Sequence, residues 1–110
     1  MTLLYLNSNK MGEGDSLLGE KLMIVFLEKI LLQSIKIDTI ICVNSAAYLT
    51  TVNDKTVSIL SKIEEKGTVI STCGTCLDFF EIRNNLRVGD VGSMDLIVKL
   101  KDNASKIINP

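Results

Sequence analysis

The sequence contains no histidine and only one proline, Pro110, and both shortages narrow what the protein can do. Without histidine there is no Ser-His-Asp triad, no Cys-His pair and no histidine-ligated metal ion. Acid–base chemistry would therefore depend on carboxylates, lysines, tyrosines, water or thiols. The scarcity of proline and the hydrophobic share of 46% favour one globular core over a disordered chain. We expect a single domain, residues 1–110.

The chain also lacks an excess of positive charge and lacks long apolar runs. Its net charge is −1 and its basic residues are scattered, which argues against nucleic acid and against an acidic membrane surface as partners. The longest apolar run, from Leu22 to Leu27, is far shorter than a membrane span. Residues 1–10 show no signal-peptide pattern. These observations predict a cytoplasmic protein.

Apolar runs and amphipathic stretches alternate along the sequence. Strands are expected at 2–6, 38–43, 68–72, 86–91 and 105–108, and helices at 16–33, 54–66, 75–84 and 93–101. Such alternation is typical of a parallel sheet with helices on both faces and right-handed crossovers. The predicted fold class is therefore α/β: a three-layer α/β/α sandwich around a mostly parallel sheet of four to five strands.

The predicted helix over 16–33 has more apolar residues than a surface helix needs. Its polar side chains are confined mainly to Glu20, Lys21, Glu28, Lys29 and Gln33. The excess has two interpretations, a helix that is well covered within one chain or a helix buried between subunits of a homo-oligomer.

Two of the three cysteines, Cys73 and Cys76, lie where a predicted strand passes into a helix. We expect Thr75 to cap that helix, with Asp78 reaching back to it, so that Cys76 is the first helical residue. Ligands of open α/β sheets bind at this edge, and a helix N-terminus there lowers the pKa of a thiol. The third cysteine, Cys42, lies inside an apolar run and is interpreted as a core residue.

Loops after successive parallel strands open on one edge of the sheet, which we call the rim. The loop over 7–15, the Asn44-Ser45 pair, the cysteine segment and the Gly92-Ser93 pair are expected to share it. A glycine-rich turn can cradle an anion, although a tight turn with Asp15 as helix cap explains the same residues. The residues assigned to line the rim or bind an anion there are Gly12, Gly14, Asp15, Asn44, Ser45, Gly74 and Thr75.

The rim residues also carry a family resemblance. The matching residues are Gly12-Glu13-Gly14-Asp15, Leu18-Gly19, Asn44-Ser45, Cys73-Gly74-Thr75-Cys76-Leu77, Leu86, Val88-Gly89-Asp90-Val91 and Met94. In these residues the chain resembles the DsrE/DsrF-like sulfur-relay family. It is most similar to the C-terminal domain of the YedF-type sulfurtransferase-like selenium metabolism proteins.

The resemblance implies an α/β sandwich, homo-oligomers and a persulfide-carrying cysteine after the third strand, a place that Cys73 occupies. Cys76 matches the additional cysteine of the YedF-type C-G-T-C pattern. Proteins of this type usually carry a TusA-like domain ahead of this one, so the resemblance implies a stand-alone version or a separated domain, with a TusA-like sulfur carrier as a possible partner. Departures are Ser45-Ala46-Ala47 for Ser-Gly-Val, and Gly92-Ser93-Met94 for an Asn before Met.

Several functions stay open for Cys73 and Cys76. The first is a sulfur-carrier or sulfurtransferase-like protein that needs no cofactor, with Cys73 as carrier and Cys76 as resolving thiol. The second is a dithiol redox switch. A zinc site would need ligands from two subunits, since two thiolates are not four ligands, and no metal is predicted. The last alternative is a non-catalytic, oligomeric binding module.

Overall fold

Five parallel strands form the centre of the molecule in the computed structural model, which describes all residues from 1 to 110. The strands are β1 (Thr2–Leu6), β2 (Thr39–Cys42), β3 (Val69–Cys73), β4 (Asp90–Gly92) and β5 (Lys106–Ile108). Their order in the sheet is β4-β3-β2-β1-β5, and every neighbouring pair is parallel. The prediction of an α/β fold with a parallel sheet of up to five strands is confirmed.

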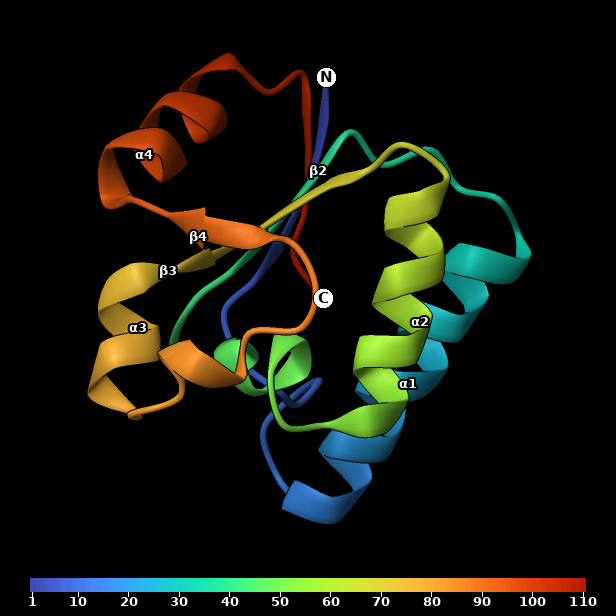
Figure 1. The fold of residues 1–110 in the computed structure, drawn as a ribbon. Helices are drawn as coiled ribbons and strands as arrows, with labels where there is room; N and C mark the ends of the chain where they lie inside the picture. The colour runs from blue at the N-terminus through green and yellow to red at the C-terminus, as the bar shows by residue number, and fades with distance from the viewer.

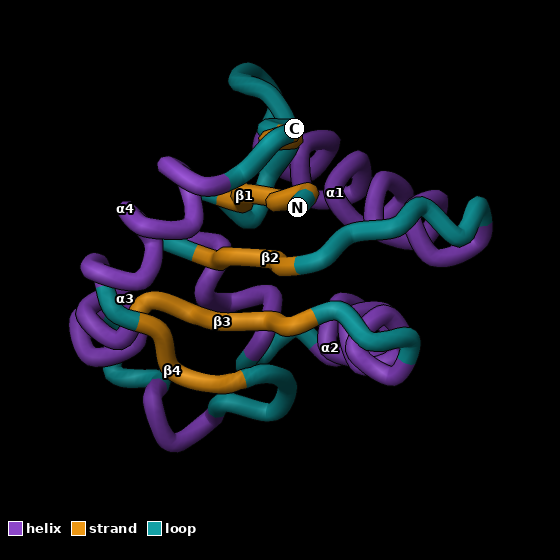
Figure 2. The backbone as a smooth tube through the Cα atoms, turned by 90° about the horizontal axis from the view of Figure 1, so that it is seen from above, coloured by secondary structure: helices purple, strands orange, loops and turns teal.

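Helices cover both faces of this sheet. α1 (Ser16–Leu32) and α2 (Asp54–Glu65) lie on one side of the strands, and α3 (Gly74–Phe79) and α4 (Met94–Asn103) lie on the other (Figures 1 and 2). Two short 3₁₀ helices, η1 (Asn44–Thr50) and η2 (Arg83–Asn85), complete the connections. The predicted three layers are therefore present.

Three helices begin at the capping residues that the sequence indicates. The carboxylate of Asp15 accepts the N–H of Leu18 at 2.9 Å, at the start of α1. In the same way Asn53 caps α2 and Ser93 caps α4, each through the N–H three residues on. These bonds satisfy amide groups that would otherwise lack a partner in the first turn.

Three segments differ from their predicted form. Residues 44–50, which lie between a predicted strand and a predicted helix, form η1. α3 ends at Phe79 rather than near Asn84, because Glu81 adopts a left-handed backbone (φ 57°) and the N–H of Ile82 turns back to the carbonyl of Leu77 at 2.9 Å. β4 begins at Asp90 and not at Leu86, since the N–H of Arg87 bonds to the carbonyl of Thr50 instead of to the sheet.

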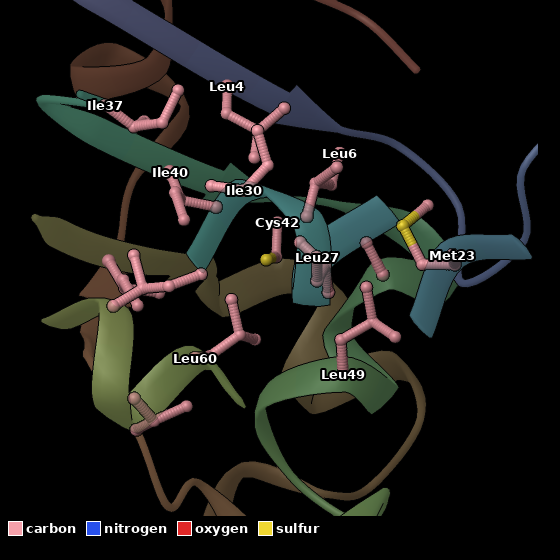
Figure 3. Close-up of a cluster of buried hydrophobic side chains, with 14 residues drawn as sticks. Leu4, Leu6, Met23, Leu27, Ile30, Ile37, Ile40, Cys42, Leu49 and Leu60 are labelled. Carbon is pink, nitrogen blue, oxygen red and sulfur yellow. The ribbon is translucent and has the colours of Figure 1, made fainter. Parts of the chain in front are cut away.

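The main core lies between the sheet and the α1–α2 layer. Fourteen buried residues form it, including Leu27, Ile40 and Leu60 (Figure 3). Cys42 is among them with no exposed surface, which confirms its interpretation as a core residue. A smaller cluster of Leu3, Ile41, Val43, Cys73 and Ile97 fills the opposite face, under α4.

The apolar excess of α1 lies partly at the surface. Only Gly19, Met23, Leu27 and Ile30 of this helix are buried. Leu17, Leu18, Leu22, Val25 and Leu32 are between 40% and 79% exposed. Within one chain α1 is therefore not covered on all sides. No helix of the protein combines the length and apolar character that a bilayer crossing requires.

Candidate functional site

The rim of the sheet is held together by hydrogen bonds between the loops that follow β1, β2 and β3. Ser45 Oγ accepts the N–H of Asn9 at 3.0 Å and lies 3.5 Å from Ser8 Oγ. From the same turn, the N–H of Asn44 donates to Cys76 Sγ at 3.1 Å. Three of the four predicted rim loops are thus linked by direct contacts.

Cys73 is the last residue of β3 and also the residue that precedes α3. Its side chain lies on the α4 face of the sheet, is only 3% exposed and belongs to the cluster of Leu3, Ile41 and Ile97. Its assignment as the sulfur carrier carried the expectation that this thiol is exposed at the end of the strand. That expectation is wrong, because β3 passes into α3 without an intervening loop and the sulfur stays in the core.

Cys76 is the third residue of α3, not the first. The helix begins at Gly74, with Cys73 as its N-cap and no side-chain capping bond. The predicted capping box between Thr75 and Asp78 is therefore wrong: Thr75 is already helical. Asp78 instead forms a two-pronged ion pair with Arg83, with a shortest distance of 2.6 Å. Cys76 is half-buried and is the more accessible of the two cysteines.

A small apolar pocket lies directly over the Cys76 sulfur. Its volume is about 280 Å³, and its lining residues are Asn44, Thr75, Cys76, Phe79 and Phe80. The Phe79 ring is 81% exposed and meets the Phe80 ring edge-on at 5.3 Å. Phe80 is in turn anchored on Tyr48, with ring centroids 4.9 Å apart. The reactive atom of the site is therefore bordered by two aromatic rings.

The electrostatics of the site differ from the prediction of an acidified thiol. The pKa of Cys76 is raised above its ordinary value of 9.0, first by burial and then by Cys73, while the Asn44 N–H acts against that rise. α3 has only six residues and gives no strong dipole to offset the burial. Cys76 is therefore mostly a thiol at neutral pH.

Asn44 has a backbone suited to its role. Its φ of 53° lies in the left-handed region, which asparagine tolerates better than most residues. This conformation follows the last residues of β2 and begins η1. The amide that points at Cys76 is therefore set by the turn and does not depend on the mobility of a side chain.

The glycine loop is organised around α1 and not around the cysteines. Gly12 and Gly14 both have left-handed backbones, with φ of 82° and 126°, and both are exposed. The N–H of Met11 bonds to the carbonyl of Gly19 at 2.9 Å, and Asp15 caps the helix. The contacts that reach toward the cysteine side of the rim come from Ser8 and Asn9.

Gly74 is needed for close packing at the start of α3. A Cβ atom at this position would lie 2.9 Å from Arg83 Nη2 and 3.0 Å from a methyl group of Val91. The glycine therefore lets the Arg83 side chain and β4 approach the turn between the two cysteines. Cys73 and Cys76 are not joined by a disulfide, and no third Cys, Asp or Glu joins them in a metal-binding group.

Comparisons with known proteins find likenesses of structure. No protein-family model and no curated protein matches the sequence. The crystal structure of the ychN protein from E. coli superposes with a TM-score of 0.67 at 17% identity, over 99% of this chain and 97% of that one. MTH1491 from Methanobacterium thermoautotrophicum, a protein of unknown function, superposes with a TM-score of 0.72 at 13% identity over the same shares.

The chain has the YchN-like, DsrE-like fold. The matches span nearly the whole of each chain, so the likeness includes the entire sheet and its helices. Identities of 17% and 13% carry the fold and no further property.

Tyr5 is not among the site residues predicted from the sequence. Its ring packs against the cluster that contains Cys73, and Lys101 Nζ lies 3.5 Å from the ring centroid. The pKa of Tyr5 is raised by burial and then by charge on Cys76 and Cys73. The strand alternation of β1 was a usable signal, because it puts Tyr5 on the opposite face from Leu4 and Leu6.

Sequence reasoning also missed Phe79 and Phe80 as walls of the pocket. Phe79 and Phe80 follow Cys76 by three and four residues, a spacing that brings side chains together on a helix and that was a usable signal. The DsrE-like fold of this chain therefore presents one accessible thiol with a backbone donor beside it, a second thiol behind it and an apolar pocket in front. Such a group can act as a nucleophile toward a sulfur atom.

Proposed function

We propose that the protein is a sulfur carrier of the sulfur-relay type, in which Cys76 receives and passes on a sulfane sulfur atom. The observation that carries the proposal is the placement of Cys76 Sγ, which lines an open pocket and accepts the Asn44 N–H at 3.1 Å. The resemblance of residues 73–77 and of the other rim residues to the sulfur-relay family supports this role, and the fold agrees with it. Cys73 is the resolving thiol in this proposal, because it lies behind Cys76 and is only 3% exposed.

The transfer needs no external oxidant or reductant. The Cys76 thiolate attacks the outer sulfur of a donor persulfide, R–S–SH, so that a bond from Cys76 Sγ to that sulfur forms and the donor's S–S bond breaks. The donor leaves as R–SH after taking up the proton that Cys76 gave up. An acceptor thiolate then attacks the same outer sulfur of the Cys76 persulfide, and Cys76 is restored as a thiol.

Cys73 offers a second exit for the sulfur. Attack of the Cys73 thiolate on Cys76 Sγ expels the outer sulfur as hydrogen sulfide and leaves a Cys73–Cys76 disulfide. A further turnover then requires an external dithiol to reduce that disulfide. The redox-switch interpretation involves the same Cys73–Cys76 disulfide, so one pair of thiols could serve both functions.

Intact-mass measurement after incubation with a low-molecular-weight persulfide tests the proposal. Cys73→Ser should gain about one sulfur atom and Cys76→Ser should gain none, while the native chain should show either that gain or, after attack by Cys73, the loss of two hydrogens to a disulfide. Cys42→Ser is the matched control, since its thiol has no exposed surface and should not affect the gain. An adduct that persists in Cys76→Ser, or an adduct on no variant, would contradict the assignment to Cys76.

We also propose that the protein is related to the C-terminal domain of the YedF-type proteins. This relation is supported by the C-G-T-C pattern of residues 73–76 and by the Gly12-Glu13-Gly14-Asp15 loop. On this view the acceptor or donor is a protein of the TusA type. Sulfur and selenium have the same group chemistry, and the residues of the pocket favour neither.

We also propose that the chain forms homo-oligomers through α1. Four exposed apolar residues, Leu18, Leu22, Val25 and Leu32, recur at intervals of four, three and seven residues. Such intervals place them on one side of the helix. A second copy of α1 packed against this stripe would remove it from water.

A further inference from the structure

The pocket beside Cys76 is apolar and uncharged, and this limits which sulfur donors it can accept. Its lining residues are Asn44, Thr75, Cys76, Phe79 and Phe80, and none of them carries a permanent charge. Asp78 on α3 forms an ion pair at 2.6 Å with Arg83 of η2, so these two charges offset each other. The backbone N–H of Asn44 is already donated to Cys76 Sγ.

We propose that this pocket binds the apolar group of a small, uncharged thiol or persulfide and excludes anionic sulfur donors. This inference rests on the proposed function for the identity of the reacting group, since it describes which substituent accompanies the sulfur that meets Cys76.

Size and shape agree with an aryl or short branched alkyl group. An apolar cavity of about 150 Å³ binds benzene, so about 280 Å³ holds one ring together with a neighbouring sulfur atom. The Phe79 and Phe80 rings meet edge-on, and together they offer an aromatic substituent both a ring face and a ring edge. Phe80 is fixed against Tyr48, so that one wall is preformed.

None of the residues that line the pocket offers a counter-charge to an anionic donor. Entry of thiosulfate or of a carboxylate-bearing thiol would strip water from the anion without replacing it by a basic side chain. Thr75 and the Asn44 side chain supply neutral polar groups at most. The raised pKa of Cys76 is in keeping with this environment, since a pocket that disfavours the thiolate also disfavours an incoming anion.

The exposure of Phe79 makes the inference testable without disturbing the fold. The ring is 81% exposed, so its replacement removes a pocket wall and little of the core. Val98, on α4, is 60% exposed and is not among the pocket residues. Val98 is the control position for both the alanine and the lysine substitution of Phe79.

The experiment measures how fast Cys76 reacts with two maleimides of similar size, one bearing a benzyl group and one bearing a carboxylate. Peptide mapping assigns the adduct to Cys76, and each rate is divided by that of a short peptide containing Gly-Thr-Cys-Leu. We expect the native protein to favour the benzyl reagent over the anionic one by about tenfold more than the peptide does. Phe79→Ala should reduce this preference about threefold, and Val98→Ala should leave it unchanged.

A charge-bearing variant gives a readout that a purely structural role would not produce. Phe79→Lys adds a cation to the pocket wall and should raise the rate with the anionic reagent about threefold or more, whereas Val98→Lys should not. A native preference equal to that of the peptide would overturn the inference. So would equal effects of Phe79→Lys and Val98→Lys. Alkylation involves no sulfur transfer, so the result stands apart from the persulfide measurement.

Discussion

The three cysteines have three different environments, and burial decides what each thiol can do. Cys42 lies in the main core, where burial raises its pKa to about 12, so it stays protonated and inert. Cys73 is almost as enclosed, on the opposite face of the sheet. Cys76 alone combines access to solvent with a hydrogen-bond donor on its sulfur. In this chain, which has no histidine, the position of Cys76 at the edge of the sheet is what makes it the accessible thiol.

The raised pKa of Cys76 predicts an alkaline reactivity profile. Because only the thiolate reacts, its rate with iodoacetamide should keep rising as the pH passes 9.0, where an ordinary thiol would level off. Cys73 contributes to the rise in pKa, so in Cys73→Ser the profile should move to lower pH. Rates between pH 7 and 10.5, with the adduct mapped to Cys76, provide the measurement. A reaction rate that levels off below pH 8 in the native protein would contradict a raised pKa of Cys76.

At the scale of elements, the turn between η2 and β4 depends on one glycine. Gly89 has a φ of 76°, and a Cβ atom there would lie 2.3 Å from the carbonyl oxygen of Ile70 on β3. Gly89→Ala should therefore lower the free energy of unfolding by about 3 kcal/mol or more, from backbone strain and from the clash.

Gly12→Ala separates these two terms. Gly12 has nearly the same φ, 82°, but nothing lies within 4 Å of a Cβ built on it. Its substitution should cost about 1–2 kcal/mol, the strain alone. Urea unfolding of both variants measures the difference, and equal losses would show that the contact with Ile70 relaxes without cost.

The elements also show which features a sequence makes predictable. Asp15, Asn53 and Ser93 cap helices that start within one residue of their predicted positions, because a cap depends on residues only three positions apart. The alternation of strands and helices likewise predicted the parallel sheet. The start of α3 was mispredicted, since Thr75 is a good cap in isolation and nothing local reveals that β3 runs straight into the helix.

The candidate site was predicted only in part for the same reason. Sequence position brought Asn44 and Cys76 to one rim, and their hydrogen bond follows from the parallel topology. Which sulfur is accessible depends on what packs over it, and α4 with its Ile97 covers Cys73. Tyr5 approaches the cysteines from β1, a distant part of the chain, whereas Phe79 lies three residues after Cys76 on α3, a spacing that places the two on one side of the helix.

At the scale of the whole molecule, the two notable surfaces lie on opposite sides of the sheet. The Cys76 pocket is formed by α3 and the start of η1, and the apolar stripe of Leu18, Leu22, Val25 and Leu32 belongs to α1, in the other helix layer (Figure 1). Assembly through α1 would therefore leave the pocket open. Each subunit of such an oligomer could meet a donor without separating from its partner.

This arrangement predicts that association and reactivity can be separated by mutation. Native protein should sediment as a multiple of the chain mass. Leu18→Lys combined with Val25→Lys should raise the dissociation constant about a hundredfold or more, because two cations would be buried without partners. Val98→Lys, on α4, is the matched control and should leave the mass unchanged. The benzyl preference of Cys76 should be the same in all three proteins, since none of these substitutions touches the pocket. A native chain that is monomeric at every concentration would rule out the α1 interface, and a monomeric variant that had lost the benzyl preference would show that the pocket depends on assembly.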